Sequence, residues 1–224
     1  MKFLLLLVML TACAATPQDL SGKMFTFPQE TNTAHVRLDM SKQNLDAVTV
    51  CHRSFTDLKR GHALFSLATP DNENGFTIYW NEAKKEMDAL VKNLQTQYIY
   101  LDYKSNMWYS ICTTWDSETG LVQMWFDGQP TVRKFVTSGS AIAGNTIITL
   151  GQEQDSFGGG FDLKQSFTGM ISDVHMWDHT LSPCDIQKYV DRLNFSPGNV
   201  INWSALEYQI TGKVLVEDKQ NSCY

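Results

Sequence analysis

The chain has 224 residues, of which 43% are hydrophobic, and its formal net charge is −6 at pH 7. An acidic surface repels phosphate backbones and anionic lipids, so the composition argues against nucleic acid or an anionic membrane as a direct partner. An acidic protein can still bind phosphate where a bound cation reverses the local field.

The first fifteen residues have the pattern of a secretory signal peptide. Lys2 precedes an apolar run over residues 4–10, and small residues follow up to Ala15. This run is too short to span a bilayer, and no later segment is apolar enough to cross a membrane. We therefore expect residues 1–15 to be removed, leaving a secreted, extracellular domain over residues 16–224. The alternative is a lipoprotein signal over Leu10 to Cys13, which would leave a lipidated Cys13.

Seven short runs that alternate in polarity or are rich in β-branched residues predict strands. They cover residues 35–38, 48–51, 63–67, 76–80, 108–112, 121–126 and 146–150. The pair Asp127-Gly128, which follows the sixth run, is a strong hairpin signal. The spacing is typical of an all-β fold, a two-sheet antiparallel sandwich. No linker, charge block or repeat divides the chain, so one domain is expected.

One short helix is predicted near the C-terminal end. Ser182 is the expected N-cap and Pro183 the first helical residue, while apolar residues recur at helical spacing from Ile186 to Leu193. Residues 82–97 are ambiguous, because their lysines and glutamates favour helix while tertiary context can impose strands.

Four cysteines remain once the leader is removed, and an exported chain is expected to pair them. They are Cys51, Cys112, Cys184 and Cys223. Three pairings are possible, of which we favour Cys51–Cys112 together with Cys184–Cys223.

The most informative segment is the acidic loop over residues 150–165. It follows a predicted strand and contains Glu153, Asp155, Asp162, two glutamines close to the carboxylates and three successive glycines. Hard oxygen ligands on a backbone that can bend are what Ca²⁺ requires. Nitrogen and sulfur ligands are absent, which disfavours zinc or copper. The alternative is a loop that is simply solvated.

Residues 110–117, 150–165 and 169–177 resemble the short pentraxin family, and the resemblance extends from Phe25 to Leu206. It implies a flattened jelly roll related to lectins and a cyclic homo-oligomer, usually a pentamer, with all ligand sites on one face. The family's shared disulfide supports Cys51–Cys112, whereas Cys184–Cys223 depends on cysteine parity alone. Ser110 departs from the family pattern, which has histidine there.

The resemblance also implies a set of calcium ligands that binds two ions per subunit. Glu153 and Asp155 match the carboxylates of the first ion, and Gln154 matches the residue that supplies a main-chain carbonyl. Asp162 and Gln165 match the ligands that complete the coordination of a second ion. This ion shares the same two carboxylates with the first. Asp162 is shorter than the glutamate found in the family, so the second ion is expected to bind more weakly.

In the family, an Asp-Asn pair from a loop distant in the sequence completes the coordination of the first ion. The motif itself favours Asp71-Asn72 here, whereas counting back from Trp80 favours Glu73-Asn74. We prefer Glu73 and Asn74, because the strand that follows then stays in register.

These assignments predict a calcium-dependent pattern-recognition protein of innate immunity rather than an enzyme. In the family, a phosphate monoester bridges the two ions, and Tyr79 matches the aromatic residue that packs against choline. The resemblance implies phosphocholine- or phosphoethanolamine-type ligands, an acute-phase role and complement as a downstream partner. The acidic residue that would meet the ammonium falls in the ambiguous segment 82–97 and stays unassigned.

Two alternatives remain. One is a calcium-dependent lectin that binds sugars. The other is a jelly-roll glycoside hydrolase, because Glu153 and Asp155 form a Glu-x-Asp pair, although the further glutamate that such enzymes need is absent. The sequence also leaves open whether the sequons at Asn194 and Asn202 are used.

Overall fold

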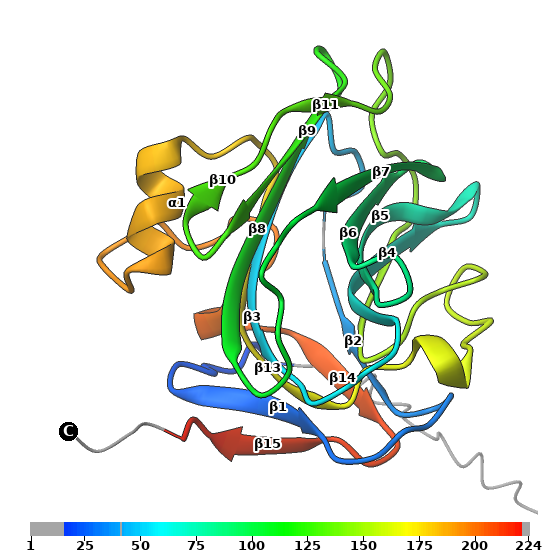
Figure 1. Cartoon of the computed structure of the whole chain (residues 1–224), viewed down its shortest axis with the longest axis vertical. Coiled ribbons are helices and arrows are strands. Elements are labelled where there is room, and N and C mark those ends of the chain that lie inside the picture. Colours follow the sequence, from blue (N-terminus) through cyan, green and yellow to red (C-terminus); the bar gives the residue numbers. More distant parts are fainter. Residues whose placement is uncertain (1–15, 41, 221–224) are drawn as a thin grey trace, which may run out of the picture.

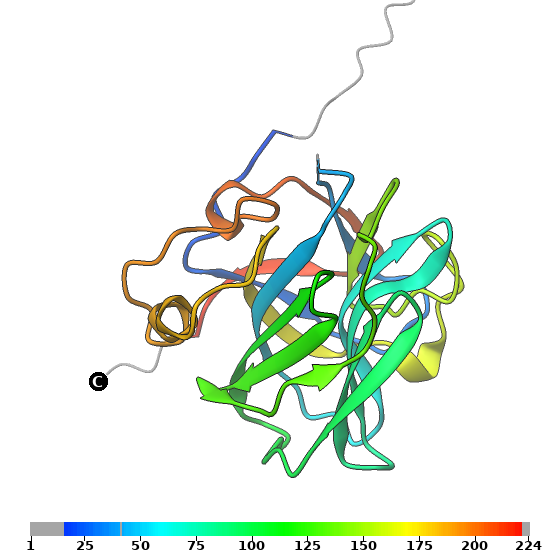
Figure 2. The ribbon, with the colours of Figure 1, turned by 90° about the horizontal axis from the view of Figure 1, so that it is seen from above.

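Two antiparallel sheets face each other, with one helix on the outside, in the computed structural model of the chain (Figures 1 and 2). The structure describes residues 16–40 and 42–220, so the predicted signal peptide and Cys223 lie outside the described residues. The predicted all-β sandwich with one short α-helix is confirmed.

The first sheet has eight strands in the order β10-β9-β8-β3-β13-β1-β15, with β11 beside β9. Its strands are β1 (Lys23–Phe27), β3 (Ala47–Phe55), β8 (Trp108–Asp116), β9 (Leu121–Phe126), β10 (Gln129–Pro130), β11 (Lys134–Phe135), β13 (Gly169–Trp177) and β15 (Leu215–Asp218). The second sheet has seven strands in the order β14-β2-β12-β4-β5-β6-β7. They are β2 (His35–Leu38), β4 (His62–Thr69), β5 (Asn72–Asn81), β6 (Glu86–Val91), β7 (Leu94–Ile99), β12 (Ile147–Leu150) and β14 (Tyr208–Thr211).

The main core lies between the sheets, where large apolar side chains such as Trp115, Phe65 and Phe76 are almost fully buried. Because successive side chains of a strand point to opposite faces, every second residue is available to this core.

A smaller apolar cluster surrounds the disulfide under the helix. Cys51 on β3 and Cys112 on β8 are register partners, and they form the predicted disulfide bond. Cys184 is exposed in the first turn of the helix. Since Cys223 is not described, the Cys184–Cys223 pair stays a prediction.

The helix α1 (Pro183–Val190) begins as predicted, with the Ser182 side chain accepting a hydrogen bond from the Asp185 amide. Ile186 and Tyr189 are buried against the first sheet. The predicted continuation to Leu193 is wrong: the helix ends at Val190, and the Leu193 side chain is 58% exposed.

The ambiguous segment forms strands. β6 and β7 make a hairpin whose turn residues, Lys92 and Asn93, both have positive φ angles of 49° and 64°. Such angles suit the tight turns that match the twist of paired strands. Pairing with β5 and burial of Met87, Ala89 and Val91 outweigh the helix preference of the nearby lysines and glutamates.

Three buried histidines should make the fold sensitive to acid. Burial lowers the pKa of His52 to about 3 and those of His62 and His175 to about 4. The unfolded chain takes up these protons near pH 6.5, so stability is lost as pH falls from about 6.5 towards 4, by up to about 4 kcal/mol per pH unit for three groups. Urea unfolding at several pH values measures this slope.

His52→Leu provides the matched variant, since neither ring nitrogen of His52 has a hydrogen-bond partner. It should raise stability at pH 5 more than at pH 7.4 and reduce the slope by about one third. An unchanged slope would show that His52 titrates normally in the folded protein.

Candidate functional site

The acidic loop leaves the second sheet at the end of β12 through a tightly packed glycine. Gly151 has a φ of +92°, and a Cβ atom there would lie 2.3 Å from the Phe27 ring. Glycine is therefore required for the chain to turn at this point. The next residues, 152–154, are buried.

Two buried glutamine side chains fix the first half of the loop. The Gln152 amide donates to the carbonyls of Thr31, at 2.6 Å, and Ala34, at 3.0 Å. The Gln154 amide nitrogen donates to the Ile147 carbonyl at 3.0 Å. The Gln154 side chain therefore serves the fold, and the ligand role of its main-chain carbonyl stays a prediction.

The second half of the loop returns to the sheet through the glycines. Ser156 and Gly159 exchange backbone hydrogen bonds of 3.2 and 3.0 Å, and Gly160 follows with a φ of +73°. Asp162 then caps the short 3₁₀ helix η1 (Leu163–Gln165) by accepting from the Lys164 amide at 2.9 Å. This turn brings Gln165 back beside the first half of the loop.

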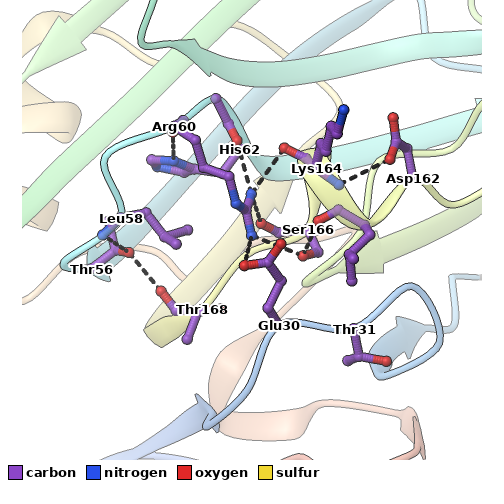
Figure 3. A network of polar contacts seen from close by, with 12 residues as sticks. Glu30, Thr31, Thr56, Leu58, Arg60, His62, Asp162, Lys164, Ser166 and Thr168 are labelled. Carbon is purple, nitrogen blue, oxygen red and sulfur yellow. Dashed lines mark hydrogen bonds and ion pairs between the residues drawn. The ribbon is translucent and has the colours of Figure 1, made fainter.

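Arg60, just before β4, holds this turn in place (Figure 3). Its guanidinium donates to the carbonyls of Lys164, at 3.0 Å, and Ser166, at 2.7 Å, and also to the Ser166 hydroxyl. The carboxylate of Glu30 lies 3.5 Å from the guanidinium of Arg60 and balances its positive charge. This contact could not be predicted from the sequence, because Arg60 is 104 residues from Lys164.

The loop and the outer face of β5, β6 and β7 enclose a cavity of about 230 Å³. It is lined by Asn74, Thr77, Tyr79, Asp88, Leu90, Gln95, Glu153, Asp155 and Gln165. Five of the predicted residues therefore meet in one place. Glu73 and Asp162 do not line it, but Glu73 is near enough to raise the pKa of Glu153, and Asp162 to raise that of Tyr79.

Three of the predicted ligands present buried oxygens that have no hydrogen-bond partner. These are Oδ1 of Asn74, Oε2 of Glu153 and Oε1 of Gln165. Leaving a buried acceptor unpaired costs about 1–3 kcal/mol, so three in one cavity are unusual unless a cation binds there. The set consists only of oxygens, both charged and neutral, which fits Ca²⁺.

Carboxylates alone do not make this site. Within the described ranges 16–40 and 42–220, no three His, Cys, Asp or Glu side chains form a group that could hold a metal. The amide oxygens of Asn74 and Gln165 are therefore essential to the donor set. Calcium accepts such neutral oxygens readily, whereas zinc prefers nitrogen and sulfur.

The cavity penalises negative charge. Burial, and after it the nearby carboxylates of Asp155 and Glu73, together raise the pKa of Glu153 to about 7. A divalent cation would reverse this penalty by supplying positive charge among the carboxylates.

The geometry favours Glu73-Asn74 over Asp71-Asn72 as the remote pair. Asn74 lines the cavity, whereas Asp71 and Asn72 do not, and Glu73 is exposed as Asp71 is. Asp162 is also exposed and already caps η1, so its role as a ligand stays a prediction.

Four lining residues were not singled out from the sequence: Thr77, Asp88, Leu90 and Gln95. Thr77 lies two residues before Tyr79 and could have been found from strand alternation. The other three lie in the segment that the sequence left ambiguous, so their register with β5 was unknown.

Comparison with known proteins settles the family. The model of the "Pentaxin family" matches residues 23–218. The chain belongs to the pentraxin family. Rat C-reactive protein is 41% identical over 89% of this chain and 86% of its own length. Pig serum amyloid P-component is 34% identical over 96% and 97%.

The fold of this pentraxin agrees with a solved relative. A native heptameric SAP-like pentraxin from Limulus polyphemus matches with a TM-score of 0.82 and 24% identity, covering 90% of this chain and 97% of that one. Family membership identifies the chain as a pattern-recognition protein of innate immunity, among relatives that are binding proteins rather than enzymes. Among the described residues, no helix has the length and apolarity to cross a membrane.

Glu153→Gln should stabilise the metal-free protein. A raised pKa means that the proton on Glu153 stabilises the fold at low pH, and this contribution is lost as pH rises through about 7. At pH 7.4 the neutral amide should add about 2 kcal/mol to the free energy of unfolding without metal. It should also abolish any further increase in the free energy of unfolding when Ca²⁺ is added. Urea unfolding with and without chelator measures both effects. Glu118→Gln, at an exposed position, is the control, and equal calcium responses in both variants would contradict the assignment.

Arg60→Met should weaken calcium binding about tenfold, because the turn that presents Gln165 loses charge-assisted hydrogen bonds. Arg60→Lys, which keeps one charged donor, should recover part of the affinity. Calorimetric titration with Ca²⁺ measures both. If Arg60→Met lowered the unfolding temperature but left calcium affinity unchanged, the residue would serve only the fold.

Proposed function

We propose that this pentraxin is a secreted, calcium-dependent binding protein for phosphorylated head groups of the phosphocholine and phosphoethanolamine type. The observation that carries the proposal is the set of buried, unpaired oxygens on Asn74, Glu153 and Gln165. They converge on one cavity from the acidic loop and from β5.

Two calcium ions per subunit fit the available donors. The first would be held by Glu73, Asn74, Glu153, Asp155 and the carbonyl of Gln154. The second would share Glu153 and Asp155 and add Gln165 and Asp162. The ions would supply the positive charge that lets an acidic protein bind a phosphate monoester.

The side chains beside the ions would orient the rest of the ligand. Tyr79 is partly exposed on the outer face of β5 and borders the cavity. Its ring offers an apolar surface to the carbon atoms of a head group, and an aromatic face attracts a cation by about 0.5–2 kcal/mol.

Assembly would strengthen binding. The Limulus relative is a heptamer, and we infer a cyclic oligomer, a pentamer by family resemblance, for this chain. Several weak sites on one face gain affinity for an array of head groups because the later contacts become intramolecular. The opposite face would then be free for complement.

The deciding experiment is binding to immobilised phosphocholine with and without chelator. The wild-type protein should be retained in Ca²⁺ and released by chelator or by soluble phosphorylated ligand. Glu153→Ala should lose retention by tenfold or more, because a shared carboxylate of both ions is gone. The matched variant Glu118→Ala should behave as wild type. Retention of the protein in the presence of chelator would contradict the proposal. Release by galactose alone would indicate a sugar-binding lectin.

A further inference from the structure

Asn202 begins one of the two sequons of the chain, and the structure shows how that tripeptide folds. The residue caps the 3₁₀ helix η2 (Trp203–Ala205). Its Oδ1 atom accepts hydrogen bonds from the Ser204 amide at 3.1 Å and from the Ser204 hydroxyl at 2.8 Å. Ser204 is exposed, so the turn lies at the surface. The asparagine amide and the serine hydroxyl of the sequon, Asn-x-Ser, therefore meet in one surface turn.

The other polar atom of the Asn202 side chain, Nδ2, is free to carry a substituent. Within residues 16–40 and 42–220, no acceptor forms a hydrogen bond with it. Asn202 is partly exposed, and Nδ2 is not one of the buried unpaired polar atoms, although Nε1 of the adjacent Trp203 is. Nδ2 is therefore in contact with water, and a group attached to it would extend into solvent.

Asn202 borders an open cavity on this surface. The cavity has a volume of about 250 Å³, and its lining includes apolar side chains of Met40 and Leu206 beside the carboxylates of Asp39 and Glu207. A sugar ring presents apolar C–H groups and hydroxyl donors, and it needs both kinds of neighbour. The cavity thus offers suitable space and chemistry beside Nδ2 for the first sugar of a glycan.

The same cavity adjoins an open edge of the second sheet. β14 is last in the strand order, pairs with β2 alone among the described strands, and leaves Ile210 39% exposed. Leu206 and Glu207, which line the cavity, come directly before β14 in the chain. An uncovered strand edge invites pairing with other chains, and natural proteins usually protect it. A bulky hydrophilic group on Asn202 would cover the start of this edge.

The sequon at Asn194 is less suited to modification. Asn194 is exposed, so exposure alone does not separate the two sites. Pro197 follows Ser196, however, and a residue before proline is restricted to extended backbone. Within the described ranges, no hydrogen bond joins Asn194 to the Ser196 hydroxyl, and the Ser196 carbonyl accepts from Nε1 of Trp177. The compact Asn-Ser turn is therefore found at Asn202 and not at Asn194.

We propose that Asn202 carries an N-linked glycan that covers this cavity and the start of the β14 edge. The inference rests on the proposed function in one respect, because only a secreted chain meets the enzyme that transfers the glycan. Nδ2 attacks the anomeric carbon of a lipid-linked oligosaccharide and loses one proton. The new C–N bond replaces the bond to the lipid pyrophosphate, which is the leaving group. Oδ1 is unchanged, so the cap of η2 is kept.

Peptide mass spectrometry of the full chain secreted from animal cells tests the site. Peptide N-glycosidase removes an N-linked glycan and converts its asparagine to aspartate. This conversion should occur at position 202 and not at Asn194. Asn202→Asp keeps an oxygen acceptor for the cap and should abolish the glycan. Ser204→Ala should do the same, whereas the matched variant Ser204→Thr keeps the sequon and should stay glycosylated. An unmodified Asn202 in the secreted protein would overturn the inference.

The covering role has a separate measurement. Light scattering should show the deglycosylated protein aggregating at least about twice as fast as the glycosylated one, because the β14 edge is uncovered. Equal rates would overturn this role. Asn194→Asp is the control and should aggregate as wild type does.

Failure of the inference can be told apart from failure of the proposed function. β2 and β14 lie at the opposite end of the sheet from β5, β6 and β7, so deglycosylation should leave calcium-dependent phosphocholine binding within about twofold. A tenfold loss would contradict the location of the glycan. A glycosylated protein that never bound phosphocholine would contradict the proposed function and leave the site at Asn202 supported. Retention of the chain inside the cells would contradict secretion, and the inference would fall with it.

Discussion

The structure of the site depends on the burial of one carboxylate among others. Glu153 is almost inaccessible, has an unpaired oxygen, and lies near Asp155 and Glu73. In the absence of a cation this arrangement opposes folding, because desolvation and like charges both penalise the ionised form. The same features become favourable once positive charge is present. A cation bound among these carboxylates would therefore stabilise the loop.

The sandwich tolerates this cost because other polar groups hold the loop rigidly. The amides of Gln152 and Gln154 bond to main-chain carbonyls of neighbouring segments, and Arg60 secures the returning turn. The amide groups of both glutamines and the terminal guanidinium nitrogens of Arg60 donate to the scaffold. The acceptors that would face a cation are left unused. This separation of donors from acceptors lets one short loop serve both folding and binding.

The sequence predicted the architecture well because its signals were local. Alternating strands, the Ser182-Pro183 helix start and the acidic loop each depend on residues close together in the chain. Family resemblance supplied the Cys51–Cys112 pair, which no periodicity could specify. The helix end was missed because Leu193 continues the apolar spacing, although the chain has already turned away at Asp191.

The ligand side of the site could not be predicted in the same way. Asp88 faces the cavity only because β6 pairs with β5 in one register, and a shift of one residue would bury it in the core. The charged residues before it favour helix, so the sequence did not specify strands there. Arg60 was missed for a related reason, since its contacts join segments about a hundred residues apart.

The size and position of the cavity bear on how such a protein can work. At about 230 Å³ it is smaller than the roughly 300–1,000 Å³ typical of small-molecule sites. It lies on the outer face of a sheet, so a head group bound there would keep part of its surface in water. One site of this kind can bury little of its ligand, and its affinity is correspondingly limited. Under the proposed function, discrimination between a single phosphorylated molecule and a surface dense with them would come from the number of sites presented together. A shallow cavity on a flat sheet face suits that task, because several copies facing one way can meet the same surface at once.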